Sequence, residues 1–180
     1  LDLSRVDFAD DFFEQKAKSI NKTFAAMAEL EQGAIANPDE NRMVGHYWLR
    51  KPELAPSTEI SQQITSTIEN VKAFAAAIHS GEVSGVDGLF ENVIVIGIGG
   101  SALGPQFVSH ALGKPKEDRM KMWFFDNTDP DGIDKVIDNV GSNLDKTLCI
   151  VISKSGGTKE TRNGMLEAKV AYERAGLNFG

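Results

Sequence analysis

A stretch rich in hydroxyl groups and glycine follows an apolar run late in the sequence. It consists of Ser153, Lys154, Ser155, Gly156, Gly157 and Thr158. The hydroxyl groups and the bare backbone N–H groups are hydrogen-bond donors, and the lysine adds a positive charge. A helical pattern begins at Thr158, and the N-terminus of a helix attracts anions. Donors that converge on one terminal group suit a phosphate monoester. A plain helix cap with spare hydroxyl groups is the alternative.

A second glycine-rich stretch, from Gly97 to Pro105, also follows an apolar run. Its sequence is Gly-Ile-Gly-Gly-Ser-Ala-Leu-Gly-Pro. The glycines allow a sharp turn and the close approach of a ligand to the backbone, so this stretch predicts an anion site at the start of a helix. A tight turn without a ligand is the alternative. Gly99 and Gly104 have the spacing of a P-loop, but Pro105-Gln106 replaces that motif's Lys and Ser or Thr.

A dinucleotide site is a weaker hypothesis. Gly97-x-Gly99-x-x-Ala102 fits the loose form of its glycine motif, and Asp126 follows Ala102 by 24 residues, within the range for a ribose-binding carboxylate. Asp126 and Asn127 equally suit the polar bonds of a turn, with Asp129 as a helix cap. A dinucleotide fold does not need a second phosphate-type loop, so the hydroxyl-rich stretch argues against it.

The single cysteine and the three histidines show no spacing typical of metal ligands, and we expect no metal site. Cys149 cannot form an internal disulfide, and its place in an apolar run predicts a buried, unreactive thiol. His79 and His110 fall within helical patterns and are expected to be ordinary polar or packing residues. His46 lies in a distinctive segment of turn signals and aromatic residues, and its role stays open.

Two kinds of apolar pattern define the elements that must position these residues. Apolar side chains recur with helical spacing from Phe8 to Leu30 and from Ser57 to Ser80. Continuous apolar runs start at Val93, Lys121 and Thr147, and such runs are typical of strands buried on both faces of a parallel sheet. The three starts are 28 and 26 residues apart, which is the span of a strand with its crossover helix.

Helix start signals fill the gaps between these runs. Proline at a first helical position predicts helices from 105 towards 113 and from 131 to 139, and a last helix is predicted over 158–175. Right-handed crossovers then give an α/β fold, a doubly wound parallel sheet in a three-layer sandwich. We assign a helical N-terminal segment to 1–88 and the sheet domain to 89–180. We expect that domain to be incomplete after its third strand and helix.

The composition is that of a globular chain. The 180 residues carry a net charge of −7, with 41% hydrophobic and 25% charged residues. The acidic balance argues against general nucleic-acid binding, and no apolar stretch reaches the ~18 residues that span a membrane. No signal or transit peptide is visible, which favours the cytoplasm.

Three sequence blocks resemble those of the glucose-6-phosphate isomerase (phosphoglucose isomerase) family, whose members have the sugar isomerase, or SIS, fold. The blocks are Asn37-x-x-Glu40-x-Arg42-x-x-x-His46-x-x-Leu49-Arg50, Gly97-Ile-Gly-Gly-Ser-x-Leu-Gly-Pro105 and Ser153-Lys-Ser-Gly-Gly-Thr-x-Glu-Thr161. They occur in the family's order with compatible spacing. The third block departs from the family's Ser-Lys-Thr-x-Thr-Thr-x-Glu-Thr loop at Ser155, Gly156 and Gly157, which removes one hydroxyl donor.

The resemblance implies roles for individual residues in binding the phosphate of a hexose phosphate. Gly100 and Ser101 would contact it from the first loop. Ser153, Lys154 (through its backbone N–H), Ser155 and Thr158 would hold it from the second, with Gly156 and Gly157 shaping that loop. Family members interconvert glucose 6-phosphate and fructose 6-phosphate, in glycolysis and gluconeogenesis, through a cis-enediol.

The same resemblance implies an N-terminal fragment without the catalytic residues. The family's glutamate base and its ring-opening histidine and lysine lie further downstream, so no catalytic residue is assigned here. The reaction needs no metal or nucleotide cofactor, and the full-length protein is expected to be a homodimer without nucleic-acid or membrane partners. A non-catalytic SIS module that binds a sugar phosphate for regulation is the alternative, against which the helical N-terminal segment and its 37–50 block argue.

Overall fold

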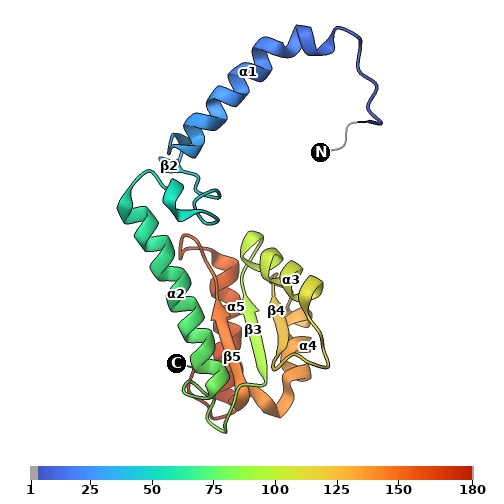
Figure 1. Cartoon of the computed structure of the whole chain (residues 1–180). Coiled ribbons are helices and arrows are strands. Elements are labelled where there is room, and N and C mark those ends of the chain that lie inside the picture. Colours follow the sequence, from blue (N-terminus) through green and yellow to red (C-terminus); the bar gives the residue numbers. More distant parts are fainter. Residues whose placement is uncertain (1–3, 180) are drawn as a thin grey trace. The chain divides into compact units, whose positions relative to one another are not determined.

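The computed structural model describes residues 4–179, and the chain divides into two compact units (Figure 1). The division falls inside helix α2 (Thr58–Ser80), between Ala73 and Phe74. The boundary expected from the sequence lies later in the chain, at 88/89. In the structure, the end of α2 and the connector that follows it belong to the second unit. The domain boundary placed at 88/89 stays a prediction.

The first unit contains helix α1 (Phe12–Glu31), a short hairpin of β1 (Ile35–Asn37) and β2 (Arg42–Met43), the 3₁₀ turn η1 (Pro52–Leu54) and most of α2. Asn37 Oδ1 accepts the N–H of Glu40 at 3.1 Å and so stabilises the turn between the two strands. Trp48 is buried, and its Nε1–H donates to the Glu31 carbonyl at 2.9 Å, which fixes the segment after the hairpin to the end of α1.

The second unit is built on three parallel strands in the order β4-β3-β5. These strands are β3 (Asn92–Ile96), β4 (Lys121–Phe125) and β5 (Thr147–Val151). All three predicted strands are therefore present. The register pairs Ile96 with Phe125 on one side and with Val151 on the other, so the three strands end together.

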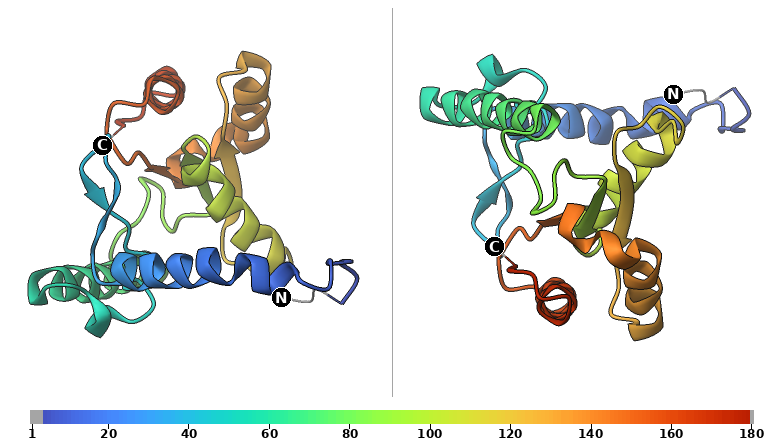
Figure 2. Two further views of the ribbon diagram at one scale, coloured as in Figure 1. Left: turned by 90° about the horizontal axis from the view of Figure 1, so that it is seen from above. Right: turned by 90° about the horizontal axis from the view of Figure 1, so that it is seen from below.

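Helices cover both faces of this sheet. Helix α3 (Gly100–Leu112) lies on one face, and α4 (Pro130–Val140) and α5 (Lys159–Arg174) lie on the other (Figure 2). The 3₁₀ turn η2 (Gly141–Lys146) joins α4 to β5. The core beneath α4 and α5 is formed by buried side chains from the sheet, both helices and η2: Ile94, Ile96, Phe125, Ile133, Val140, Leu144, Ala168 and Tyr172. The predicted α/β fold, a doubly wound parallel sheet with helical layers on both sides, is confirmed.

Several helix ends carry the residue types that favour a helix start or stop. Ser57 Oγ accepts the N–H of Ile60, and Asp129 Oδ2 accepts the N–H of Gly132, so both residues cap helices. Gly81 and Gly176 follow α2 and α5 with φ angles of 84° and 74°, the left-handed conformation that ends a helix.

The prediction that Pro105 opens a helix was wrong. Helix α3 already begins at Gly100, and Pro105 lies inside it. Gly99 provides the physical reason, because its φ of 56° and ψ of −124° turn the chain directly out of β3 into the helix. The helix therefore starts on the glycines and tolerates the proline one turn later.

The prediction that all three strands are buried on both faces was correct only for the central one. Every residue of β3 is buried, whereas Ile150 and Val151 of β5 and Met122 of β4 are exposed. The outer strands each have one neighbour in a three-stranded sheet. Continuous apolarity in a sequence does not distinguish a covered central strand from an uncovered edge.

Candidate functional site

Hydrogen bonds between neighbouring strands bring the chemistry-bearing loops to one edge of the sheet. The N–H of Gly97 donates to the Phe125 carbonyl at 3.1 Å, and the N–H of Ile152 donates to the Ile96 carbonyl at 2.9 Å. The loops that follow β3, β4 and β5 therefore start side by side. Ligands of doubly wound folds bind at this carboxyl edge of the strands.

The loop after β3 leads into α3 with its backbone facing open space. Gly97 is buried, whereas Gly99 and Gly100 are exposed, and a Cβ at either exposed glycine would meet no atom within 4 Å. The N–H of Ser101 donates to the Ile98 carbonyl at 3.2 Å, so Ser101 is held in the first turn of the helix. The backbone of Gly99 and Gly100 is thus open to close approach at the positive end of α3, where the predicted residue Ser101 also lies.

The loop after β5 is held by hydrogen bonds between its own residues. The N–H of Gly156 donates to Ser153 Oγ at 3.0 Å, and the N–H of Gly157 donates to Ser155 Oγ at 3.1 Å. Ser153 Oγ–H donates to Thr158 Oγ1 at 3.3 Å. These three bonds connect the hydroxyl groups of the loop to its own backbone and to one another.

Burial divides this loop into a half-buried base and an exposed tip. Ser153 and Thr158 are half-buried, whereas Lys154, Ser155 and the two glycines are exposed. Thr158 occupies the N-cap position of α5, but its side chain makes no capping hydrogen bond. Thr158 Oγ1 accepts from Ser153 within the loop instead, and the phosphate interpretation of this stretch stays a prediction.

The loop after β4 contains the hydrogen bonds of a polar turn, which was one of the two interpretations of Asp126 and Asn127. Asn127 Nδ2 donates to Asp126 Oδ1 at 2.9 Å, and the N–H of Asp129 donates to Asn127 Oδ1 at 2.8 Å. The other oxygen of Asp126, Oδ2, accepts the side-chain amide of Gln106 at 2.6 Å. Sequence reasoning did not select Gln106, because a contact over 20 residues between a helix and a strand end leaves no local signal.

The histidines lie away from this edge or in the other unit. His110 lies in the last turn of α3, at the opposite end of the helix from Gly100, and His79 lies in the last turn of α2. His46 belongs to the first unit. Within residues 4–179, no three His, Cys, Asp or Glu side chains are arranged to hold a metal ion.

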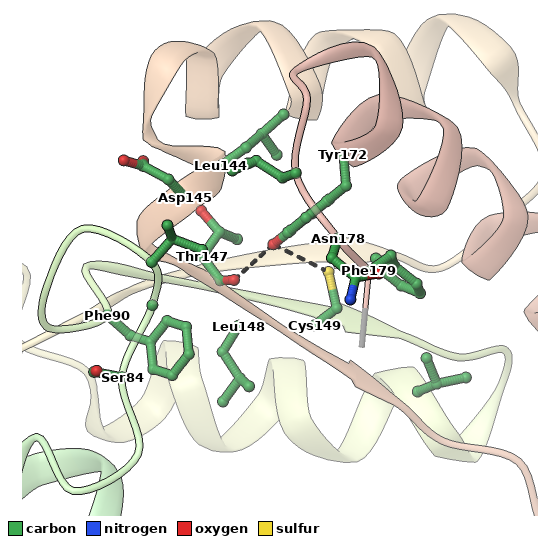
Figure 3. A pocket seen from close by; sticks show the side chains of 14 residues that line it. Ser84, Phe90, Leu144, Asp145, Thr147, Leu148, Cys149, Tyr172, Asn178 and Phe179 are labelled. Carbon is green, nitrogen blue, oxygen red and sulfur yellow. Dashed lines mark hydrogen bonds between the residues drawn. The ribbon is translucent and has the colours of Figure 1, made fainter.

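A cavity of about 440 Å³ lies along β5, between α5 and the connector over residues 84–90 (Figure 3). Tyr172 Oη–H donates to the Thr147 carbonyl at 2.6 Å, and Cys149 Sγ lies 3.8 Å from the same hydroxyl oxygen. Burial raises the pKa of the Cys149 thiol, and the Tyr172 hydroxyl partly opposes that rise. Burial also raises the pKa of Tyr172 far above its ordinary value. Cys149 is thus a neutral, partly buried thiol at pH 7, as expected of an unreactive one.

Comparisons with known proteins identify the family of this fold and these loops. The family model described as phosphoglucose isomerase matches residues 4–176. A glucose-6-phosphate isomerase of Geobacter sulfurreducens is 62% identical over 181 aligned residues, and one of Geobacter sp. (strain M21) is 58% identical over 180. Each alignment covers 99% of this chain and 34% of the relative.

A solved structure has the same fold. The crystal structure of a glucose-6-phosphate isomerase from Chlamydia trachomatis superposes with a TM-score of 0.74 at 26% sequence identity, over 95% of this chain and 34% of that one. The chain thus spans about a third of the length of the relatives it matches. No helix within residues 4–179 combines the length and apolarity needed to cross a membrane. Because the family model matches almost the whole length of this chain, the chain belongs to the phosphoglucose isomerase family.

Proposed function

We propose that this chain forms one side of the phosphate site of an enzyme that interconverts glucose 6-phosphate and fructose 6-phosphate. One observation carries the proposal: the glycine-rich loop after β3 and the hydroxyl-rich loop after β5 start on paired strands, joined by the bond from Ile152 N–H to the Ile96 carbonyl. Each loop leads into the N-terminus of a helix, α3 or α5. Two positive helix ends and several hydroxyl donors at one sheet edge suit a phosphate dianion.

Each loop residue has a proposed part in holding the phosphate. Gly100 and Ser101 contact it from the start of α3. From the other loop, Ser153, Ser155 and Thr158 offer hydroxyl groups and Lys154 its backbone N–H, while Gly156 and Gly157 shape the backbone. When phosphate binds, it replaces bonds that the loop makes with itself, such as Ser153 Oγ–H to Thr158 Oγ1. The local positive field of the helix ends opposes the net charge of −7.

The proposed phosphate site holds the substrate at a point away from its reacting carbon atoms. The phosphate is remote from C1 and C2, between which the proton moves, so its binding energy anchors and orients the sugar for proton transfer. We assign no catalytic base to these 180 residues. The complete enzyme is proposed to be a cytoplasmic homodimer of the SIS fold that acts in glycolysis and gluconeogenesis without metal or nucleotide.

The test is substitution of the half-buried hydroxyl groups in a full-length enzyme that contains this segment. Ser153→Ala and Thr158→Ala should each raise the KM for fructose 6-phosphate about 10- to 100-fold, the usual effect of losing a hydrogen bond to a charged group. Ser142→Ala is the matched control, because Ser142 lies exposed in η2, before β5 rather than after it. An unchanged KM in both loop variants would contradict the phosphate assignment. Binding of sugar phosphate without turnover by the full-length protein would instead indicate a regulatory module.

A further inference from the structure

Helix α3 is intrinsically weak at the end that the proposed phosphate site uses. Gly104 lies inside the helix, where glycine costs about 1 kcal/mol relative to alanine, and Gly100 occupies its first position. Pro105 has no N–H for the Ser101 carbonyl one turn earlier. No side-chain cap supports the start of the helix, since Gly99 stands at the N-cap. The direction of this first turn must therefore be fixed by contacts outside the helix.

Gln106 supplies such a contact directly after the proline. Its Nε2–H donates to Asp126 Oδ2 at 2.6 Å, a bond that joins the second turn of α3 to the residue after β4. Both residues are half-buried. A hydrogen bond to a carboxylate is stronger than one between neutral groups, and partial burial reduces competition from water. Asn127 Nδ2 holds the other oxygen of Asp126 and so restrains the carboxylate itself.

The same strand end also holds the entry to the glycine-rich loop. Gly97 N–H donates to the carbonyl of Phe125, the residue before Asp126. The segment from Ile98 to Pro105 is thus bonded to the end of β4 at both of its ends. Gly100 and Ser101, the proposed phosphate contacts, lie between the two attachments.

We propose that Gln106 and Asp126 are positioning residues, which hold the start of α3 at the place and angle that phosphate binding requires. This inference rests on the proposed function of Gly100 and Ser101. Neither residue touches phosphate in this scheme. Their loss leaves every donor present, but the first turn of α3 moves away from the loop after β5, and affinity for the sugar phosphate falls.

The experiment compares variants of the pair in a full-length enzyme that contains this segment. Gln106→Leu and Asp126→Ala should each raise the KM for fructose 6-phosphate about 5- to 10-fold, with kcat changed less than about twofold. Asp126→Asn keeps one side-chain oxygen, which can still accept from Gln106, but loses the acceptor for Asn127, so it should restore part of the affinity lost in Asp126→Ala. The double variant should be no worse than either single one, because both remove the same bond.

Controls separate positioning from simple loss of stability and from failure of the proposed function. His110→Leu changes an exposed residue of the same helix and should leave KM unaltered. An unchanged KM in Gln106→Leu beside a raised KM in Ser153→Ala would overturn the positioning role and leave the phosphate site standing. An Asp126→Asn variant as impaired as Asp126→Ala would also overturn it, since charge rather than position would then matter. An unchanged KM in both Ser153→Ala and Thr158→Ala would instead refute the phosphate site.

Discussion

Ser101 packs directly against the backbone of Gly97. A Cβ built on Gly97 would lie 2.9 Å from Ser101 Cβ and 3.1 Å from the Ser101 carbonyl oxygen, both closer than ordinary van der Waals contact. Gly97 is buried, so a side chain there has no open space to enter. The first turn of α3 can sit this close to the end of β3 only because residue 97 has no side chain.

The substitution Gly97→Ala should therefore displace Ser101 and the first turn of α3. We expect a loss of about 1–3 kcal/mol in the free energy of unfolding, the usual effect of overpacking a tight site. In a full-length enzyme the same variant should raise the KM for fructose 6-phosphate. Gly104→Ala is the control, because a Cβ there meets nothing within 4 Å and alanine favours the helix. Urea unfolding of the two variants checks the stability difference, and equal stability would contradict the packing argument.

The two glycines at the tip of the loop after β5 differ in backbone conformation, so alanine substitutions at the two positions can be compared. Gly156 has a φ of 71°, whereas Gly157 lies outside the left-handed region, and neither would place a Cβ closer than 3.8 Å to a neighbour. Gly156→Ala should thus destabilise the fold by about 1 kcal/mol through backbone strain alone. Gly157→Ala should be neutral or slightly stabilising. Urea unfolding of both variants measures the difference, and an equal effect would show that the loop adapts its backbone at no cost.

The sequence predicts the strands and most helix ends because their signals are local. The three apolar runs of the second half each start within one residue of their strand, and Ser57 and Asp129 cap helices as their residue types favour. The glycine-rich loop and the hydroxyl-rich loop lie at the carboxyl edge of the sheet because the strands are parallel, and the regular spacing of the strands in the sequence already indicates this topology. The residues of both predicted loops could therefore be selected without a structure.

What the sequence does not predict depends on contacts between distant residues. Pro105 favours a helix start when taken alone, yet Gly99 starts the helix earlier by adopting a conformation open only to glycine. The bond from Gln106 to Asp126 and the cavity beside Cys149 join elements that are far apart in the chain. The internal bonding of Ser153, Ser155 and Thr158 is equally unpredictable, because the same residue types could have capped α5.

The thiol of Cys149 should react slowly with thiol reagents while the chain is folded. Burial raises its pKa, so less thiolate is present at a given pH than in an exposed cysteine. At pH 8 we expect reaction with a disulfide reagent such as DTNB to be at least about tenfold slower in the native chain than in urea. Because Cys149 is the single cysteine, the signal belongs to it alone. Equal rates in the native and unfolded chain would contradict the burial of this thiol.

The hydroxyl group of Tyr172 should stabilise the fold at neutral pH. Tyr172→Phe removes the donor to the Thr147 carbonyl and leaves that oxygen without its 2.6 Å partner. We expect the free energy of unfolding at pH 7.5 to fall by about 1–3 kcal/mol, measured by urea titration. The variant should also raise the pKa of Cys149 further, since the Tyr172 hydroxyl lowers it in the native chain. A slower reaction of Cys149 with DTNB checks this second effect.

The stability that the Tyr172 hydroxyl group contributes should decrease at high pH. The pKa of Tyr172 is raised in the folded chain above its ordinary value of 10.0, so the unfolded chain loses the tyrosine proton first as pH rises. The contribution of this group is therefore complete below about pH 10 and declines at higher pH. Phenylalanine has no ionisable hydroxyl group. The difference in the free energy of unfolding between the unmutated protein and Tyr172→Phe should therefore become smaller above pH 10. A gap that is constant or that widens between pH 9 and pH 11 would show that the Tyr172 proton is not held by the fold.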